Sequence, residues 1–374
     1  MAILLSCVVA FRDADFLKHL YRYRWLAGSL GSVALVSVFS WVFREYEDAP
    51  FRSVKPYLTL IAIIPLILAM RTLNFRRSEI SLIAIFAGLS LGAYALSEVC
   101  AGTRGRWDAT ENAVEFGNYA ALIGGLLLIL GTQLHTVRWK WLIIGLSLAG
   151  SVAALYVSYK SGTRSSVGVV LLATLCVFGY ILFSLKNWGV LVLLGVCFVC
   201  AAFTISETGR FRALETELSK AFAGGYSSGS LGQRLELWRL SGCIASEFPV
   251  LGVGTGSFKY AQLDHWPKTC GVGIRASKGY FSQAHSVYFQ ALATMGYLGL
   301  VSLMALFAML ISAALLNIRS GGLFLAFVVS SFMVAGITVD LFFKDFMVAR
   351  FVLLTSLCLV WLQHNDTGGL KGVT

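Results

Sequence analysis

Three short motifs place polar side chains beside long apolar runs, and each combines residue types that can do chemistry. The first is SGTRSS at residues 161–166, a small polar turn that opens an apolar helix. The amides of a helix start and the guanidinium of Arg164 both favour a bound anion such as phosphate. The alternative is an ordinary Ser/Gly helix start without a ligand.

The second motif runs over residues 227–258 as SSGSLGQRLELWRLSGCIASEFPVLGVGTGSF. Ser230 can cap a helix that carries Arg234 and Trp238 one turn apart on one face, with Arg239 close by. An arginine held near a tryptophan is ready for a planar, two-pronged contact with phosphate. The glycines at 252, 254 and 256 lack the spacing and the βαβ unit of a dinucleotide site, so we expect a flexible turn there.

The third motif is AHSVYFQ at residues 284–290, immediately before a long apolar run. His285 stands at the water boundary of a membrane helix, where a histidine can take a proton from a hydroxyl near neutral pH. Tyr288 follows on the same helix. A lone histidine in this setting can also be purely structural.

Further charged residues are expected on the same side of the membrane as these motifs. The arginines and lysines that we assign to one cavity are Arg104, Arg106, Lys160 and Arg350, with Asp340, Lys344 and Asp345 nearby. Each of them taken singly could simply extend its charge to the membrane surface. Their gathering on one side favours a site for an anionic ligand.

The elements that must position these groups are membrane helices. Of the 374 residues, 57% are hydrophobic and only 13% are charged, about half of the roughly 25% in soluble proteins. Most of the long runs without Asp, Glu, Lys or Arg are long enough to cross a bilayer core, which takes about 20 apolar residues. They cover residues 25–43, 57–70, 80–97, 116–134, 141–157, 166–185, 188–205, 286–318, 320–339 and, with one arginine, 346–362.

We therefore predict an all-α polytopic membrane protein with about 10 to 12 transmembrane helices. One large cap lies between the seventh and eighth confident spans. The predicted domains are a transmembrane bundle at 1–205, the cap at 206–284, and C-terminal helices with a tail at 285–374. Short loops on the other side carry more Lys and Arg than those on the cap side, which favours an extracytoplasmic cap.

The net charge and the cysteines indicate which partners and which compartment the protein has. The net charge of +11 in a mostly lipid-embedded chain indicates membrane lipids or a lipid phosphate rather than nucleic acid. The cysteines show no metal-ligand spacing. Cys243 and Cys270 both fall in the cap and can form a disulfide in an oxidising compartment. Residues 1–11 are expected to lie at the interface or partly in the membrane.

These motifs together resemble the O-antigen ligase and polymerase superfamily, bacterial membrane glycosyltransferases that use undecaprenyl-diphosphate-linked glycans. The resemblance rests on SGTRSS, on the G-x-R-x-x-x-W block with its trailing F-P-x-x-G-x-G-x-G, and on the H-S-x-Y helix, and it covers roughly residues 150–300. His285, Ser286 and Gly296 meet the ligase pattern. Two threonines of that pattern are replaced by Gly299 and Leu300.

The resemblance implies a periplasmic cap on a multi-pass protein of the bacterial inner membrane. It implies an inverting transfer of glycan from undecaprenyl diphosphate to lipid A-core, without a metal or another cofactor. Arg164 and Arg234 would bind the diphosphate, and His285 would orient or deprotonate the acceptor. The substrate-binding residues would include Trp238, Arg239 and Tyr288 beside the basic residues named above.

Two other functions remain open at this point. A polymerase would use the same donor and join repeat units on the carrier, and the sequence does not show the acceptor. A transporter of lipid-linked glycan would need polar residues near the bilayer midplane and often repeated halves. The charge-free spans and the single cap argue against transport.

Overall fold

The computed structural model describes residues 23–73, 77–103, 107, 112–133, 140–180, 230–268, 281–318, 321–342 and 344–363. Within these ranges the regular structure is helical and contains no strand. The principal helices are α3 (Arg24–Val42), α4 (Lys55–Thr59), α5 (Ile63–Thr72), α6 (Arg77–Cys100), α7 (Ala113–Gln133), α8 (Lys140–Ser161), α9 (Arg164–Tyr180), α12 (Ser230–Glu247), α13 (Phe258–Lys268), α14 (Val287–Leu316), α15 (Gly322–Gly336) and α16 (Asp345–Gln363).

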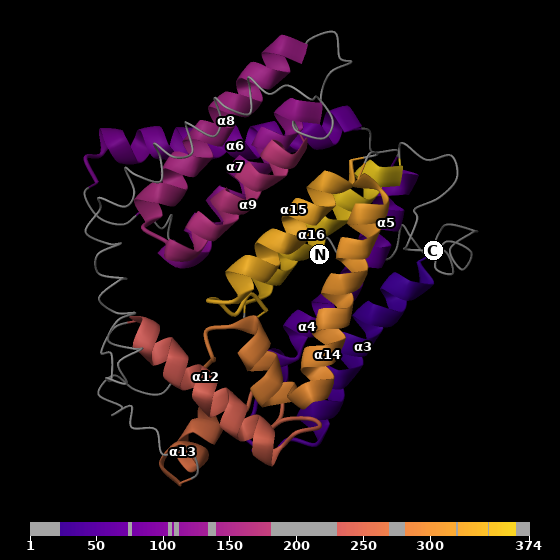
Figure 1. The fold of residues 1–374 in the computed structure, drawn as a ribbon, viewed down its shortest axis with the longest axis vertical. Helices are drawn as coiled ribbons and strands as arrows, with labels where there is room; N and C mark the ends of the chain where they lie inside the picture. The colour runs from indigo at the N-terminus through magenta and orange to yellow at the C-terminus, as the bar shows by residue number, and fades with distance from the viewer. Residues whose placement is uncertain are drawn as a thin grey trace.

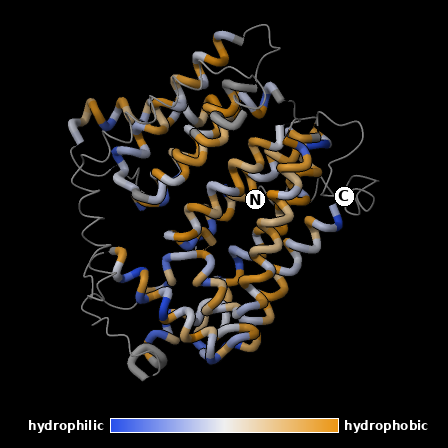
Figure 2. Tube along the Cα trace, viewed as in Figure 1, coloured by the Kyte–Doolittle hydropathy of each residue, from blue (hydrophilic) through white to orange (hydrophobic). Residues whose placement is uncertain are grey.

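The helical, polytopic membrane architecture is confirmed, whereas the predicted number of about 10 to 12 spans is not. Seven helical segments of the described residues are long and apolar enough to cross a membrane, and α15 is a shorter apolar helix. The predicted span at 188–205 lies outside the described residues. Large apolar side chains such as Phe86 and Val152 remain 73% and 68% exposed, as expected of a surface that meets lipid. Figure 2 shows these apolar runs along the helices.

The helices form two packed groups that meet at α15. One group contains α6, α7, α8 and α9, and the other contains α3, α5, α14, α15 and α16. Helix α15 packs against α7 and α9 of the first group and against α14 and α16 of the second (Figure 1). Glycines allow close approach in the first group, because a Cβ at Gly88 would lie 2.3 Å from the side chain of Leu127.

Helices α12 and α13 lie at one end of the molecule, beside the first half of α14 and the end of α3 (Figure 1). The Oγ of Ser40, near the end of α3, donates a hydrogen bond to the carbonyl of Leu251 at 2.9 Å. Lys344, just before α16, forms an ion pair with Glu115 in the first turn of α7 at 2.9 Å. Within the predicted cap, Lys259 lies on the same side as Lys344, because both line one cavity.

Helix α14 is broken at Gly296, where φ is 65° and ψ is −163°. The loop after α12 pairs with both sides of the break. The N–H groups of Val253 and Gly254 donate to the carbonyls of Ala293 and Thr294, and those of Tyr297 and Leu298 donate to Pro249 and Val250. These four hydrogen bonds satisfy backbone groups that a break in an apolar helix would leave unpaired.

The glycine-rich motif is therefore a turn, as predicted, but one that is firmly paired with α14. A Cβ at Gly252 would lie 2.5 Å from the carbonyl oxygen of Ala293, and one at Gly296 would lie 2.4 Å from that of Val250. Both glycines also have positive φ angles. The residues 249–254, which we call the strap, thus approach α14 at a distance that only glycine permits.

Candidate functional site

His285 occupies a strained backbone position directly before α14. Its φ angle of 52° makes it the only non-glycine residue with positive φ among the described residues. Such a conformation costs on the order of 1–3 kcal/mol and persists only when the surroundings impose it. Strain of this kind is typical of functional sites.

Hydrogen bonds on both sides of His285 impose this conformation. Gln262 of α13 holds Phe281, since its Oε1 accepts from the Phe281 N–H at 3.1 Å and its Nε2 donates to the Phe281 carbonyl. Gln290 accepts from the N–H of Ala284 at 2.8 Å. The Oγ of Ser286 donates to the carbonyl of Gly336 at 3.2 Å. Residues 281–286, the His285 segment, are thereby tied to α13, α14 and α15.

The surroundings of His285 favour its neutral form. The edge of its ring meets Phe281 with centroids 5.6 Å apart. Burial lowers the pKa of His285 below its usual value, and the positive charge of Arg234 lowers it further. The charge of Arg234, on α12, therefore reaches His285, which lies directly before α14. A neutral imidazole at pH 7 can accept a proton or a hydrogen bond.

Helix α12, which carries Arg234, is anchored in a small apolar cluster. Leu237, Leu240 and Ile244 are fully buried in this cluster together with Val253 and Ala293. Trp238, one turn after Arg234, stacks on Phe289 of α14 with ring centroids 5.0 Å apart and planes 10° apart. This contact fixes α12 against the start of α14, beside the His285 segment.

Two further groups of α12 are the indole N–H of Trp238 and the guanidinium of Arg239. The indole N–H of Trp238 is buried and has no hydrogen-bond partner among the described residues, so it is a donor without an acceptor. Arg239 is exposed. Burial raises the pKa of Glu236, and the charge of Arg239 opposes that shift, which places Arg239 beside Glu236.

The SGTRSS motif forms the tight connection between α8 and α9. Gly162 has a φ of 67°, and the Oγ of Ser161 lies 2.9 Å from the Oγ1 of Thr163. Thr163 donates to the carbonyl of Ala113 at 2.9 Å, and Ser165 donates to Oδ1 of Asn118. These hydroxyls hold the turn on α7. Arg164 is the first residue of α9, and its side chain lies outside the described part of the structure.

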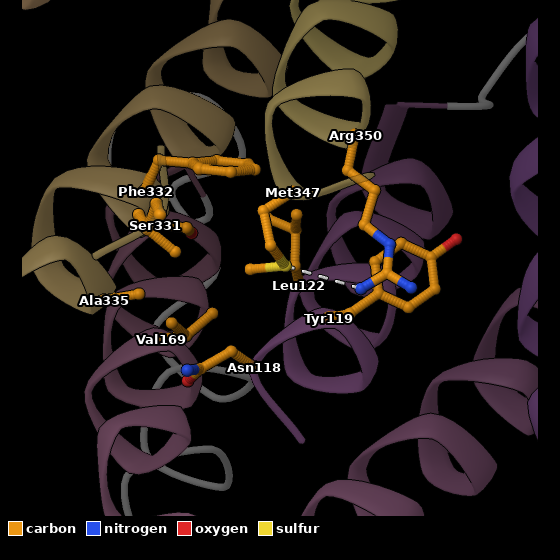
Figure 3. Close-up of a pocket in the computed structure, with 10 residues that line it drawn as sticks. Asn118, Tyr119, Leu122, Val169, Ser331, Phe332, Ala335, Met347 and Arg350 are labelled. Carbon is orange, nitrogen blue, oxygen red and sulfur yellow. Dashed lines mark hydrogen bonds between the residues drawn. The ribbon is translucent and has the colours of Figure 1, made fainter. Parts of the chain in front are cut away.

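The remaining predicted binding residues have contacts of their own. The Lys160 ammonium lies 5.5 Å from the ring centroid of Trp107. The Tyr288 hydroxyl donates to the carbonyl of Met333 on α15 at 2.8 Å. The Arg350 guanidinium lies 4.3 Å from the ring centroid of Tyr119, and Figure 3 shows it above that ring beside a small cavity. Arg104 and Arg106 lie outside the described residues.

A much larger cavity of about 770 Å³ adjoins the His285 segment, whose residue Ser282 forms part of its wall. Its other walls come from the chain around 50–57, from 255–260, from α14 and from 340–346. Four cations and two carboxylates face it: Arg52, Lys55, Lys259, Lys344, Asp340 and Asp345. Lys344 and both aspartates were predicted near the site from the sequence. Arg52, Lys55 and Lys259 were not, because their only signal in the sequence is their position in basic loops on the cap side.

Asp340 is a buried carboxyl in the wall of this cavity. Burial raises its pKa to about 7, and a hydrogen bond from the N–H of Phe342 to its Oδ1, at 3.2 Å, opposes that shift. With its pKa raised this far, Asp340 can hold a proton near neutral pH. The group can then act as donor or acceptor.

The described residues contain no cluster of three or more His, Cys, Asp or Glu side chains suited to a metal ion. Cys243 of α12 is disulfide-bonded, whereas Cys100, Cys176 and Cys358 are free. The predicted partner, Cys270, lies outside the described residues. A disulfide in α12 is typical of an oxidising compartment.

Comparison with known families gives one match. Residues 149–304 match the sequence model of the family described as O-antigen ligase, a stretch that includes the α8–α9 turn, α12, the strap and the His285 segment. A comparison with curated protein sequences finds no significant match. The resemblance to the O-antigen ligase and polymerase superfamily is confirmed over residues 149–304, and the long apolar helices are those of a multi-pass membrane protein.

Proposed function

We propose that this chain is an O-antigen ligase, an inverting glycosyltransferase that moves glycan from undecaprenyl diphosphate to lipid A-core oligosaccharide. The observation that carries the proposal is a strained His285 that feels the positive charge of Arg234, inside the segment that matches the family. Transfer from a diphosphate to a hydroxyl requires a cation and a base in one site.

In the proposed reaction a hydroxyl oxygen of the acceptor attacks the anomeric carbon of the donor sugar. The bond from that carbon to the diphosphate oxygen breaks, and the diphosphate leaves with the electron pair. Arg234 stabilises its growing negative charge through charge-assisted hydrogen bonds, with Arg164 as a second candidate from the head of α9. His285 orients the acceptor hydroxyl and accepts its proton.

The orphan indole N–H of Trp238 fits the same proposal. It lies one turn from Arg234 on α12 and lacks an acceptor among the described residues. A diphosphate or sugar oxygen would accept a hydrogen bond from this N–H. Without such an acceptor the buried donor stays unpaired, at a cost of about 1–3 kcal/mol. Trp238 would therefore act in donor binding as well as in packing.

We place the active site on the periplasmic side of the bacterial inner membrane. The disulfide of Cys243 supports this side, because disulfides persist in the periplasm and are rare in the cytoplasm. The distribution of Lys and Arg among the short loops points the same way. The cap, residues 206–284, would then cover the membrane-embedded donor.

A polymerase remains the second candidate because of one residue at the start of the second half of α14. The ligase pattern has a threonine where this chain has Gly299, and a Cβ there would lie 2.2 Å from the Cβ of Met295. The break at Gly296 thus excludes a threonine at 299 without rearrangement. An altered α14 would change the acceptor side and leave Arg234 and His285 in place.

Reconstitution of the purified chain tests the proposal. The protein is supplied with an undecaprenyl-diphosphate glycan and, separately, with lipid A-core. Transfer to lipid A-core supports the ligase, and growth of the carrier-linked chain supports the polymerase instead. If neither product forms, glycan transfer is refuted and transport is favoured. His285→Ala serves as the inactive control and should lose about 10²- to 10⁴-fold in rate.

Metal independence is a separate part of the proposal and has its own test. The cationic side chains near His285 would take the role that Mg²⁺ has in other diphosphate chemistry. Transfer should therefore continue in EDTA at the rate seen with Mg²⁺ present. A loss of activity that Mg²⁺ or Mn²⁺ restores would overturn this part and direct attention to Asp340, Asp345 and the glutamates of the cap.

A further inference from the structure

An apolar groove lies between α6, α7 and α16 and has a volume of about 110 Å³. Its wall on α7 consists of Tyr119, Ile123, Leu126 and Leu130, which recur every three or four residues and therefore share one face of that helix. None of the described residues that line the groove is charged. Its surface is suited to a hydrocarbon chain.

The groove has the length of one lipid leaflet. From Tyr119 to Leu130 helix α7 rises about 16 Å at roughly 1.5 Å per residue, and half of a hydrocarbon core of about 30 Å is about 15 Å. Helices α7 and α16 both begin at the Lys344–Glu115 ion pair, so Trp361 of α16 lies at the same end of the groove as Leu130. One acyl chain of one leaflet matches this length.

The groove opens toward the surrounding lipid. Ile83 of α6 and Leu353 of α16 belong to its walls and are 43% and 44% exposed. Water is a poor occupant of such a surface, because an apolar wall offers it no hydrogen-bond partners. The groove is therefore suited to a membrane lipid.

A cation lies at the end of the groove where α7 and α16 begin. The guanidinium of Arg350 lies 4.3 Å from the ring centroid of Tyr119, which is part of the groove wall (Figure 3). Arg350 also comes one turn before Leu354, another residue of the wall. Stacking on the ring keeps the charge beside the groove. Glu115, one turn before Tyr119 on α7, is already paired with Lys344.

Two buried polar groups beside Arg350 have no hydrogen-bond partner among the described residues. They are the side-chain NH₂ group of Asn118, which is 5% exposed, and the hydroxyl of Ser331, which is 2% exposed. Both residues line the cavity of about 20 Å³ that Arg350 and Tyr119 also line (Figure 3). A cavity of this size has room for about one oxygen-sized group. An ester or phosphate oxygen of a lipid could accept hydrogen bonds there.

We propose that the groove binds a glycerophospholipid of the cap-side leaflet, with its phosphate at Arg350 and one acyl chain between α6, α7 and α16. The phosphate is negatively charged in every such lipid, so a guanidinium binds the head while the apolar walls bind the chain. The lipid fills the gap between the two packed groups of helices. Arg350 and the groove residues do not line the 770 Å³ cavity, so this site is distinct from it.

The first test measures the contribution of the phosphate. The full chain is stripped of lipid in detergent and titrated with dipalmitoyl phosphatidylglycerol or with dipalmitoylglycerol, which has the same chains without the phosphate, and native mass spectrometry measures the bound lipid. The phospholipid should bind about 10- to 100-fold more tightly, the usual effect of a charge-assisted hydrogen bond, and Arg350→Gln should lose this preference.

Arg24→Gln is the matched control for this variant. The guanidinium of Arg24 also lies over an aromatic ring, 5.7 Å from the centroid of Trp25, at the start of a helix. Neither residue belongs to the groove. The Arg24→Gln chain should therefore keep the preference of the natural chain for the phospholipid.

The second test fills the groove from α6. Ala87 is part of the wall, so Ala87→Phe places a ring where the acyl chain would lie and should weaken binding of phosphatidylglycerol about tenfold or more. Ala149→Phe is the control, since Ala149 is exposed on α8 outside the groove. Added phosphatidylglycerol should raise the thermal unfolding midpoint of the natural chain and of Ala149→Phe, but not that of Ala87→Phe.

The outcomes decide the assignment without any measurement of glycan transfer. Equal binding of phosphatidylglycerol and dipalmitoylglycerol to the natural chain overturns it, and so does an unchanged preference in Arg350→Gln. If Ala87→Phe does not fold, Arg350→Gln still decides. Undecaprenyl phosphate that displaces phosphatidylglycerol at equal concentration would give the groove to the carrier of the donor and also overturn the proposal.

Discussion

The side chain of Gln290 accepts a hydrogen bond from the backbone N–H of Ala284, six residues earlier, at 2.8 Å. This bond closes a loop around His285 and the first turn of α14. Gln290 also lines the large cavity. One buried side chain therefore links the strained backbone at His285 with the wall of the large cavity.

The pH dependence of transfer should report the pKa of His285. Burial and the charge of Arg234 both lower this pKa below its ordinary value near 6.5, so the neutral base persists as the pH falls to 6.5. The rate should decline only at lower pH, when His285 takes up a proton. Single-turnover transfer between pH 5 and pH 8 measures the position of this decline.

The variant Arg234→Gln should move the decline in rate to higher pH, because it removes the positive charge that lowers the pKa of His285. NMR of labelled histidine, with the signal assigned by its absence in His285→Gln, follows the same pKa without catalysis. A His285 signal that titrates at or above 6.5 in the natural chain would contradict the neutral base.

The shape of the Arg234 side chain should matter beyond its charge. Arg234→Ala should reduce the transfer rate about 10²- to 10³-fold, as the loss of one transition-state donor does elsewhere. Arg234→Lys should restore little of this, because an ammonium keeps the charge but loses the planar fork. Rates are compared at equal amounts of folded protein, with Arg24→Lys as the control. Comparable turnover of Arg234→Lys and the natural chain would refute a two-pronged contact.

The strap should make Gly296 intolerant of even one methyl group. Gly296→Ala places a Cβ 2.4 Å from the carbonyl oxygen of Val250 in a backbone conformation that costs alanine on the order of 1–3 kcal/mol. We expect a lower thermal unfolding midpoint in detergent. Gly242→Ala is the matched control, since no neighbour lies near its Cβ and alanine favours a helix by roughly 0.5–1 kcal/mol. Equal midpoints for Gly296→Ala and the natural chain would mean that the strap does not hold α14.

Asp340 should make the protein less stable as the pH rises. Its folded pKa of about 7 lies above the about 3.9 of an unfolded aspartate, so between these values the folded chain binds more protons. The free energy of unfolding then falls through this window, by at most ~4 kcal/mol, and levels off above pH 7. Asp340→Asn should remove this part of the dependence.

Thermal unfolding of both proteins at pH 5 and pH 8 measures the effect. The midpoint should drop more for the natural chain than for Asp340→Asn. Asp48→Asn, in an exposed loop, provides the control and should behave as the natural chain does. A drop that Asp340→Asn does not reduce would assign the pH dependence to other groups.

The helices themselves were largely predictable, because charge-free runs are long and lipid demands internally paired backbone. The run 80–97 became α6, and the run 141–157 became α8, each extended by polar ends. The break in α14 was hidden, since residues 286–318 form one uninterrupted apolar run. Only the approach of the strap, from a distant part of the sequence, makes a positive φ at Gly296 favourable.

The site was predictable where one local motif supplied one side chain. Arg234 and His285 were proposed from their motifs, and in the structure the charge of Arg234 reaches His285. Partner choice was not predictable. Trp238 stacks on Phe289, and Tyr288 binds Met333, because tertiary packing selects among neighbours that spacing along one helix does not show. Arg52 and Lys259 line one cavity but are about 200 residues apart in the sequence, so no local pattern joins them.

The strap also sets a rule for building chimeric enzymes from this scaffold. Four backbone hydrogen bonds cross between residues 249–254 and the break in α14, so the two segments form one structural unit despite the His285 segment between them. If the cap alone were exchanged, a foreign loop would face the break in α14. The backbone N–H and C=O groups at the break would then lose their hydrogen-bond partners, with no water to replace them. Donor and acceptor preferences can therefore be recombined only if the graft runs without interruption from α12 into the second half of α14.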